Sequence, residues 1–121
     1  MPAPRFAKAT PELVAAFDRA LPAKGGIERR RMFGYPSAFV NGNMFAGVFA
    51  DRIFVRLPPD QRAELLRLAG ARPFEPMPGR PMKDYMVVPT ATHGRPRELA
   101  TWIARASRHA AALPAKTKKR P

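Results

Sequence analysis

Residues 37–49 read Ser-Ala-Phe-Val-Asn-Gly-Asn-Met-Phe-Ala-Gly-Val-Phe, and this stretch decides the fold. Asn41 and Gly42 both tolerate a positive φ, which a two-residue hairpin turn of the favoured twist requires. Apolar residues, several of them aromatic or β-branched, flank the pair on both sides, as expected of two paired strands. The sequence therefore predicts a β-hairpin with Asn41-Gly42 at its tip.

The neighbouring segments extend this hairpin into a sheet. From Ile27 to Leu57 the hydrophobic pattern has a period of two, which is typical of strands. The pattern predicts the first strand at 27–33, before Gly34, and the hairpin strands at 37–40 and 43–49. Asp51-Arg52 predicts a second turn, with weaker chemistry because no glycine follows the aspartate. Together these segments predict an antiparallel meander of about four strands, and residues 85–88 predict a fifth, short strand.

Three helices are predicted around the sheet. The first begins at Thr10-Pro11-Glu12, where a capping hydroxyl, a proline and an acid suit a helix start, and it ends at Pro22. The second follows Pro58-Pro59-Asp60, and Gly70 suits the position past its end. The third runs from about Pro96 to Leu113, with one apolar face and arginines roughly opposite. One-sided helices on an antiparallel sheet make an α+β domain.

Length and composition predict one small domain. The 121 residues suffice for a core without staples, and we expect a domain over 10–113 between a disordered arm, 1–9, and a basic disordered tail, 114–121. The chain has no cysteine, which excludes disulfides, thiol nucleophiles and thiolate zinc sites. No targeting segment and no apolar run of membrane-spanning length is present, so we expect a cytoplasmic protein without membrane contact.

The strongest compositional feature is a formal charge of +13 with a pI of about 11.6. One interpretation is a polyanion partner, such as nucleic acid. The other is compositional, because abundant arginine, alanine and proline are also expected of a GC-rich coding sequence. If the charge is functional, the candidate polyanion-binding residues are Arg29, Arg31, Lys83, Arg97, Arg105, Arg108, Lys118 and Lys119.

No pattern in the sequence points to catalysis. His93 and His109 are too few and too isolated for a metal site. Ser37 and Ser107, the only serines, do not lie in a nucleophile motif. We expect Asp84, between a lysine and a tyrosine, to form a salt bridge. The sequence therefore predicts no metal, no cofactor and no enzyme activity.

The stretch around the hairpin resembles the N-terminal domain of the TfoX (Sxy) family of bacterial competence regulators. The resemblance includes Met32-Phe33-Gly34, Asn41-Gly42 and Met44-Phe45-Ala46, and it continues over about 12–112. It implies an α+β domain without known catalysis, in which these motif residues are turn and core positions. Full-length members carry a second, helical C-terminal domain and act in transcriptional control of DNA uptake. This chain ends where that domain would begin, so we expect a single-domain member of the family.

Two functional hypotheses follow. The first is a non-enzymatic binding or regulatory module, associated with nucleic acid or with another protein. The alternative is a small ligand-binding protein or enzyme with its site between the sheet and the proline-rich segment 72–83, near Arg56, Asp84 and Tyr85. A free edge of the antiparallel sheet could also pair across a two-fold axis, which predicts a homodimer.

Overall fold

The computed structural model of the chain describes residues 9–23, 26–32, 34–77 and 79–115. Their helices and strands form an α+β domain, as the sequence predicts. The six strands make one antiparallel sheet in the order β1-β2-β3-β4-β6-β5. The elements are α1 (Pro11–Ala20), β1 (Glu28–Met32), β2 (Tyr35–Val40), β3 (Asn43–Phe49), β4 (Arg52–Arg56), α2 (Pro59–Leu66), β5 (Arg72–Pro73), β6 (Tyr85–Val87), the 3₁₀ helix η1 (Thr90–Gly94) and α3 (Pro96–Ala112).

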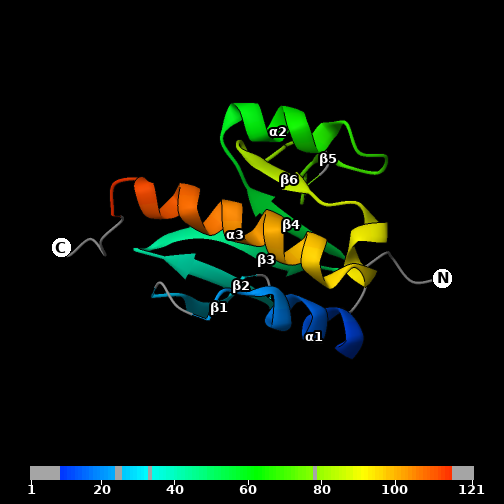
Figure 1. Cartoon of the computed structure of the whole chain (residues 1–121), viewed down its shortest axis with the longest axis horizontal. Coiled ribbons are helices and arrows are strands. Elements are labelled where there is room, and N and C mark those ends of the chain that lie inside the picture. Colours follow the sequence, from blue (N-terminus) through cyan, green and yellow to red (C-terminus); the bar gives the residue numbers. More distant parts are fainter. Residues whose placement is uncertain (1–8, 24–25, 33, 78, 116–121) are drawn as a thin grey trace.

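The helices are distributed unequally around the sheet (Figure 1). α3 lies across the central strands, and α1 packs beside it. α2 lies at the opposite end, near β5 and β6. Its one buried residue is Leu65. The arrangement leaves β1 at one edge of the sheet, beside α1, and β5 at the other edge.

The Asn-Gly hairpin is confirmed. Asn41 has a φ of 52° and Gly42 a φ of 80°, and Val40 pairs with Asn43 across the turn. The Asn43 side chain is buried and donates hydrogen bonds to the carbonyl oxygens of Ala110, at 3.4 Å, and Pro114, at 3.1 Å. The hairpin therefore holds the C-terminal end of α3, where the Ala110 carbonyl also accepts the backbone N–H of Leu113 at 3.1 Å.

Several predicted boundaries are wrong by a few residues. The second turn consists of Ala50-Asp51, with Ala50 at a φ of 56°, because Arg52 already pairs with Phe49. β2 begins at Tyr35, two residues earlier than predicted, and α2 ends at Leu66, well before Gly70. Two further elements, η1 and β5, are not predicted by the sequence pattern. β5 has only two residues, one of them a proline, so it carries no period that a sequence pattern can reveal.

The second face of the sheet is covered by the segment between β5 and β6, which we call the flap (residues 74–84). The Phe74 ring stacks on Phe54 with a centroid distance of 4.3 Å and meets the edge of Phe49 at 5.4 Å. Gly47 makes room for Phe54, because a Cβ there would lie 2.6 Å from the Phe54 ring. Every residue of β3 is consequently buried.

The sequence also predicts an aromatic core of Phe33, Phe39, Phe45, Phe49, Phe54 and Trp102, and the structure largely confirms it. Phe45, Phe49, Phe54 and Trp102 are buried, whereas Phe39 is only partly buried. Phe33, also expected in the core, lies outside the described residues. The other motif residues are turn or interior positions: Gly34 has a φ of 82°, Met32 is partly buried, and Met44 and Phe45 belong to the core.

Candidate functional site: two kinds of arginine

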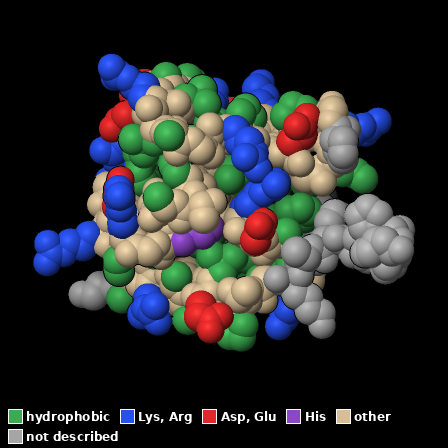
Figure 2. Space-filling model, turned by 90° about the vertical axis from the view of Figure 1, so that its right-hand side faces the viewer, with side chains coloured by type: hydrophobic (Ala, Val, Ile, Leu, Met, Phe, Trp, Pro, Cys, Tyr) green, Lys and Arg blue, Asp and Glu red, His purple; other side chains and the backbone are tan. Residues whose placement is uncertain are grey.

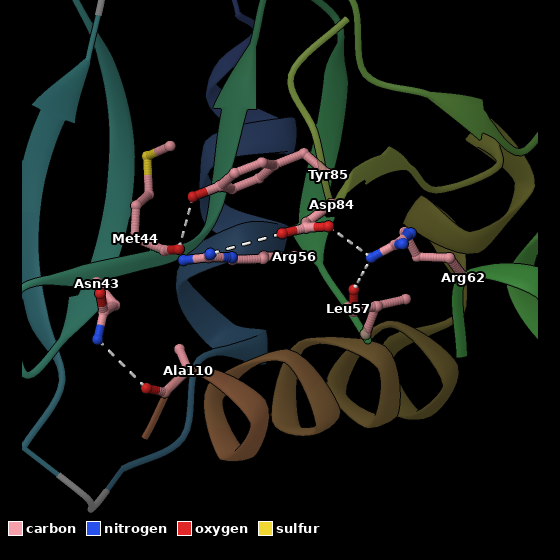
Figure 3. A network of polar contacts seen from close by, with 8 residues as sticks. All are labelled: Asn43, Met44, Arg56, Leu57, Arg62, Asp84, Tyr85 and Ala110. Carbon is pink, nitrogen blue, oxygen red and sulfur yellow. Dashed lines mark hydrogen bonds and ion pairs between the residues drawn. The ribbon is translucent and has the colours of Figure 1, made fainter. Parts of the chain in front are cut away.

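A network of polar contacts joins the flap to the β4–α2 corner (Figure 3). Asp84 accepts a 2.8 Å hydrogen bond from Arg62 Nη1 and lies 3.6 Å from Arg56 Nη2. Arg62 Nη1 also donates to the Leu57 carbonyl at 2.7 Å, and the Leu57 N–H donates to the Asp84 carbonyl at 3.0 Å. We call Arg56, Leu57, Arg62 and Asp84 the Asp84 clasp. The predicted salt bridge of Asp84 is thus confirmed.

The Asp84 clasp has the character of a structural contact. Its three charged side chains are about a quarter exposed, so their mutual attraction is screened less than at the surface. Asp84 has a φ of 76°, a conformation that non-glycine residues adopt rarely, and the clasp holds it there. Because two guanidinium groups contact its carboxylate, the Asp84 side chain is committed to these structural contacts.

Tyr85, next to Asp84, is also committed to structure. Its hydroxyl donates a 2.9 Å hydrogen bond to the Met44 carbonyl, and the Arg56 guanidinium lies 5.6 Å from its ring centroid. Burial raises the pKa of Tyr85 above its usual 10, although the positive charge of Arg56 acts in the opposite direction. The phenol therefore stays neutral at ordinary pH. The Phe54 and Phe74 rings stack on each other between the sheet and the flap, where the alternative hypothesis places a ligand.

The arginines of β1 differ from those of the Asp84 clasp. Arg29, Arg30 and Arg31, which we call the β1 edge, are all exposed. They line an open cleft of about 320 Å³ together with residues of α1 and β2. Arg29 forms an ion pair with Asp18 Oδ1, although the contact does not have hydrogen-bond geometry. Arg30 donates two hydrogen bonds to the Glu28 carboxylate. The structure thus brings the predicted Arg29 and Arg31 together and adds Arg30 to them.

The predicted basic residues of α3 separate into two kinds. Arg97 and Arg108 are exposed. Arg105 is partly buried, forms a 3.0 Å ion pair with Glu64 and packs over the Trp102 ring at 4.7 Å. Arg105 therefore joins α3 to α2, and its charge is less available to a partner than the sequence suggests.

The remaining predicted cations do not join these groups. Lys83 precedes β6, whereas Arg29 and Arg31 lie on β1, four strands away in the sheet. Lys118 and Lys119 lie outside the described residues. On the face shown in Figure 2, Lys and Arg side chains are spread over the surface, and acidic side chains lie beside several of them.

The ion pairs show which charges remain available. The described residues include 15 Lys and Arg and all nine Asp and Glu, so their formal charge is +6. Six of the nine acids form ion pairs, and these involve seven of the 15 cations. The eight described cations without an ion pair are Arg19, Arg31, Arg67, Arg72, Arg80, Lys83, Arg97 and Arg108.

The histidines lie far apart in the chain and in different surroundings. His93 lines a cavity of about 270 Å³ between α1, η1 and α3. Burial lowers the pKa of His93, and it also lowers that of His109, which lies near the positive charge of Arg56. Across the described ranges, no three His, Asp or Glu side chains are grouped so as to hold a metal ion. No helix in the described part of the chain is long and apolar enough to cross a membrane.

Two residues of these sites carry no signal in the sequence. Arg62 is the closest partner of Asp84, yet 22 positions separate them and α2 has no pattern that singles out Arg62. Asp18 faces Arg29 from α1, and it reads as an ordinary polar residue on an amphipathic helix. In each case the partner is identified only by the packing of distant elements.

Comparison with known families agrees with this architecture. The family model of the TfoX N-terminal domain matches residues 8–110, nearly the whole chain. The chain belongs to the TfoX N-terminal domain family. Neither the curated proteins nor the solved structures gave a significant match. Membership in the TfoX N-terminal domain family supports a regulatory or competence-related role in general terms, and this family is not a known enzyme family.

Proposed function

We propose that this TfoX N-terminal domain is a non-enzymatic regulatory module that binds nucleic acid through phosphate contacts from α3. The observation that carries the proposal is the position of Arg97 and Arg108. They lie 11 residues apart on one helix, close to three full turns, so both project from the same side about 16 Å apart. Both are exposed, and neither forms an ion pair with any of the nine acids, all of which lie in the described ranges.

The surface between these arginines suits an extended partner. Thr101 is exposed and Ala104 is partly exposed, and both are small. We call Arg97, Thr101, Ala104 and Arg108 the α3 stripe. One strand of a duplex carries a phosphate about every 3.4 Å along the axis, so the α3 stripe spans about five phosphates. A single small anion would not reach both arginines, whereas a polyanion would.

The C-terminal tail begins at one end of the α3 stripe. Asn43 holds the Pro114 carbonyl, just past the helix and about two turns from Arg108. The predicted basic residues Lys118 and Lys119 follow this anchored position in the sequence. We therefore propose that they add phosphate contacts beyond Arg108.

Salt dependence of DNA binding tests the proposal. The affinity of the whole chain for a fluorescent 20-base-pair duplex is measured by anisotropy between about 50 and 200 mM salt. The log–log slope of affinity against salt is expected to fall by about 0.9 for each phosphate that the protein no longer neutralises. The double variant Arg97→Gln/Arg108→Gln should therefore show a slope smaller by about two units.

A matched variant separates the effect of losing the α3 stripe from the effect of losing net positive charge. Arg67→Gln/Arg80→Gln removes two cations that are also exposed and unpaired, but it leaves α3 intact. It should leave the slope within about half a unit of the unsubstituted value. Equal reductions in both variants would show that only net charge matters and would refute the α3 stripe. Absence of binding at about 50 mM salt would refute nucleic-acid binding altogether.

A further inference from the structure

β1 is an exposed edge strand with an unusual sequence. Within the described residues it pairs only with β2, and residues 28–31 are exposed (Figure 1). Among the described residues, no backbone hydrogen bond reaches the outer side of Arg29, Arg30 or Arg31. Such an edge is a template for another strand, and natural proteins commonly protect it with charged side chains. Here all three central residues of the strand are arginines.

The register shows which backbone groups face outward. Arg31 lies opposite Pro36, which has no N–H, so this pair cannot exchange two backbone hydrogen bonds. In an antiparallel ladder, residues of such a pair turn their N–H and C=O groups away from each other. Arg29 and Arg31, two positions apart, therefore offer their N–H and C=O groups at the free edge, whereas Arg30 directs its own toward β2.

The side chains of the β1 edge are already arranged around carboxylates. On one face of the sheet, Arg29 meets Asp18 across the open cleft. On the other face, both Nε and Nη2 of Arg30 donate to Glu28 at 3.1 Å, and the guanidinium lies 4.5 Å from the Phe39 ring centroid. Arg31 is oriented by a 2.9 Å hydrogen bond to the Gly34 carbonyl but has no carboxylate partner among the described residues. The edge thus keeps a net positive charge.

We infer that an acidic, extended segment of a partner protein adds to β1 as a further strand of the sheet. Such a segment satisfies the outward backbone groups of Arg29 and Arg31, and its carboxylates lie opposite the guanidinium groups, a favourable cross-strand pairing. Nucleic acid offers phosphates but no strand backbone for the ladder. A second copy of this chain, paired antiparallel about Arg30, would set arginine against arginine, so the predicted homodimer is disfavoured at this edge.

A synthetic peptide tests this inference. The probe is a capped eight-residue peptide alternating glutamate with valine, titrated into the whole chain. At saturation, amide hydrogen exchange at Arg29 and Arg31 should slow by about tenfold, while exchange at Arg30, whose N–H faces β2, should be unchanged. A peptide with glutamine in place of glutamate should bind about tenfold more weakly.

Two controls decide what the peptide recognises. A peptide with prolines at the positions facing β1 lacks the required N–H groups and should not slow exchange. Arg29→Gln/Arg31→Gln should weaken binding about tenfold, and Arg72→Gln/Arg80→Gln should not, since those residues lie at the other end of the sheet. Equal binding of the proline peptide, or protection outside β1, would overturn the inference. A DNA duplex that slows exchange at Arg29 and Arg31 would overturn the assignment to a protein strand.

Discussion

The two ends of the sheet use arginine in opposite ways. In the Asp84 clasp, Arg56 and Arg62 are about a quarter exposed and share one carboxylate. At the β1 edge, the Arg29 and Arg30 side chains are 59% and 43% exposed, and each meets its own carboxylate. A partly buried guanidinium left without its partner is costly, whereas a solvated one is not. Substitutions in the clasp should therefore change stability, and those at the exposed arginines should change binding.

The same comparison explains why a basic composition alone is a poor guide to function. Arg56, Arg62 and Arg105 contribute to the net charge, yet each is partly buried and held by a carboxylate. Arg97 and Arg108 contribute equally and have no such partner. Only the second kind is free to bind a polyanion without first breaking an internal contact.

The largest expected effect is at the flap. Phe74→Ala removes a buried ring that stacks on Phe54 and meets Phe49, and such truncations cost about 3–5 kcal/mol of unfolding free energy. Urea unfolding measures the decrease. Met77→Ala, in the same flap but 56% exposed, should cost less than about 0.5 kcal/mol. Similar decreases in the two variants would show that the flap does not cover the sheet through Phe74.

The next effect is at the clasp itself. Asp84→Asn keeps the side-chain shape and tolerates the positive φ, but it leaves two partly buried guanidinium groups without a charge partner. We expect a decrease of about 2 kcal/mol in unfolding free energy, below the value for a fully buried pair because these groups retain some solvent. Thermal unfolding measures it.

The control for the clasp is an exposed ion pair. Asp51→Asn breaks the 3.6 Å contact of Asp51 with Arg52, where the aspartate side chain is 76% exposed. It should change stability by less than about 0.5 kcal/mol. If Asp84→Asn lowered the unfolding free energy as little as Asp51→Asn, the clasp arginines would not differ from exposed arginines in their contribution to stability.

The smallest effect concerns pH. Burial lowers the pKa of His93 and His109 below the ordinary 6.5, so the unfolded chain binds more protons than the folded chain just below pH 6.5. The histidine contribution to stability is therefore present above pH 6.5 and is lost as the pH falls through the folded-state pKa values. Urea unfolding between about pH 7.5 and pH 5 should show this decline.

His109 also reports on the clasp. Burial is the main cause of its lowered pKa; the positive charges of Arg56 and Arg62 lower the pKa further, and the negative charge of Asp84 raises it. In the Asp84→Asn variant the pKa of His109 should fall further, which an NMR titration of the imidazole measures. A rise in that pKa would contradict the charge arrangement described for the clasp.

Local chemistry makes most of the fold predictable. The Asn41-Gly42 turn, the Thr10-Pro11 helix start and the apolar face of α3 are each encoded in adjacent or periodic residues. The Ala50-Asp51 turn lies one residue from its predicted place because neither residue is a strong turn signal. η1 and β5 escape prediction because they are too short to carry a period.

The candidate sites are less predictable, for a physical reason. The arginines themselves can be named from the sequence, and the salt bridge of Asp84 is expected. Whether an arginine is free depends on which acid a distant helix brings to it, as Asp18 does for Arg29 and Glu64 for Arg105. Such contacts depend on tertiary packing, which sequence patterns do not reveal.

The most direct test of the central claim is to map the DNA contact on the folded chain. Backbone amide shifts are recorded by ¹H–¹⁵N NMR during titration with a short duplex at about 50 mM salt, where phosphate contacts are strong. We predict that the largest changes fall on α3 around Arg97 and Arg108, while amides of the Asp84 clasp and the flap stay in place. Changes centred on Arg56, Arg62 and Asp84, with α3 unaffected, would contradict the division between structural and binding arginines.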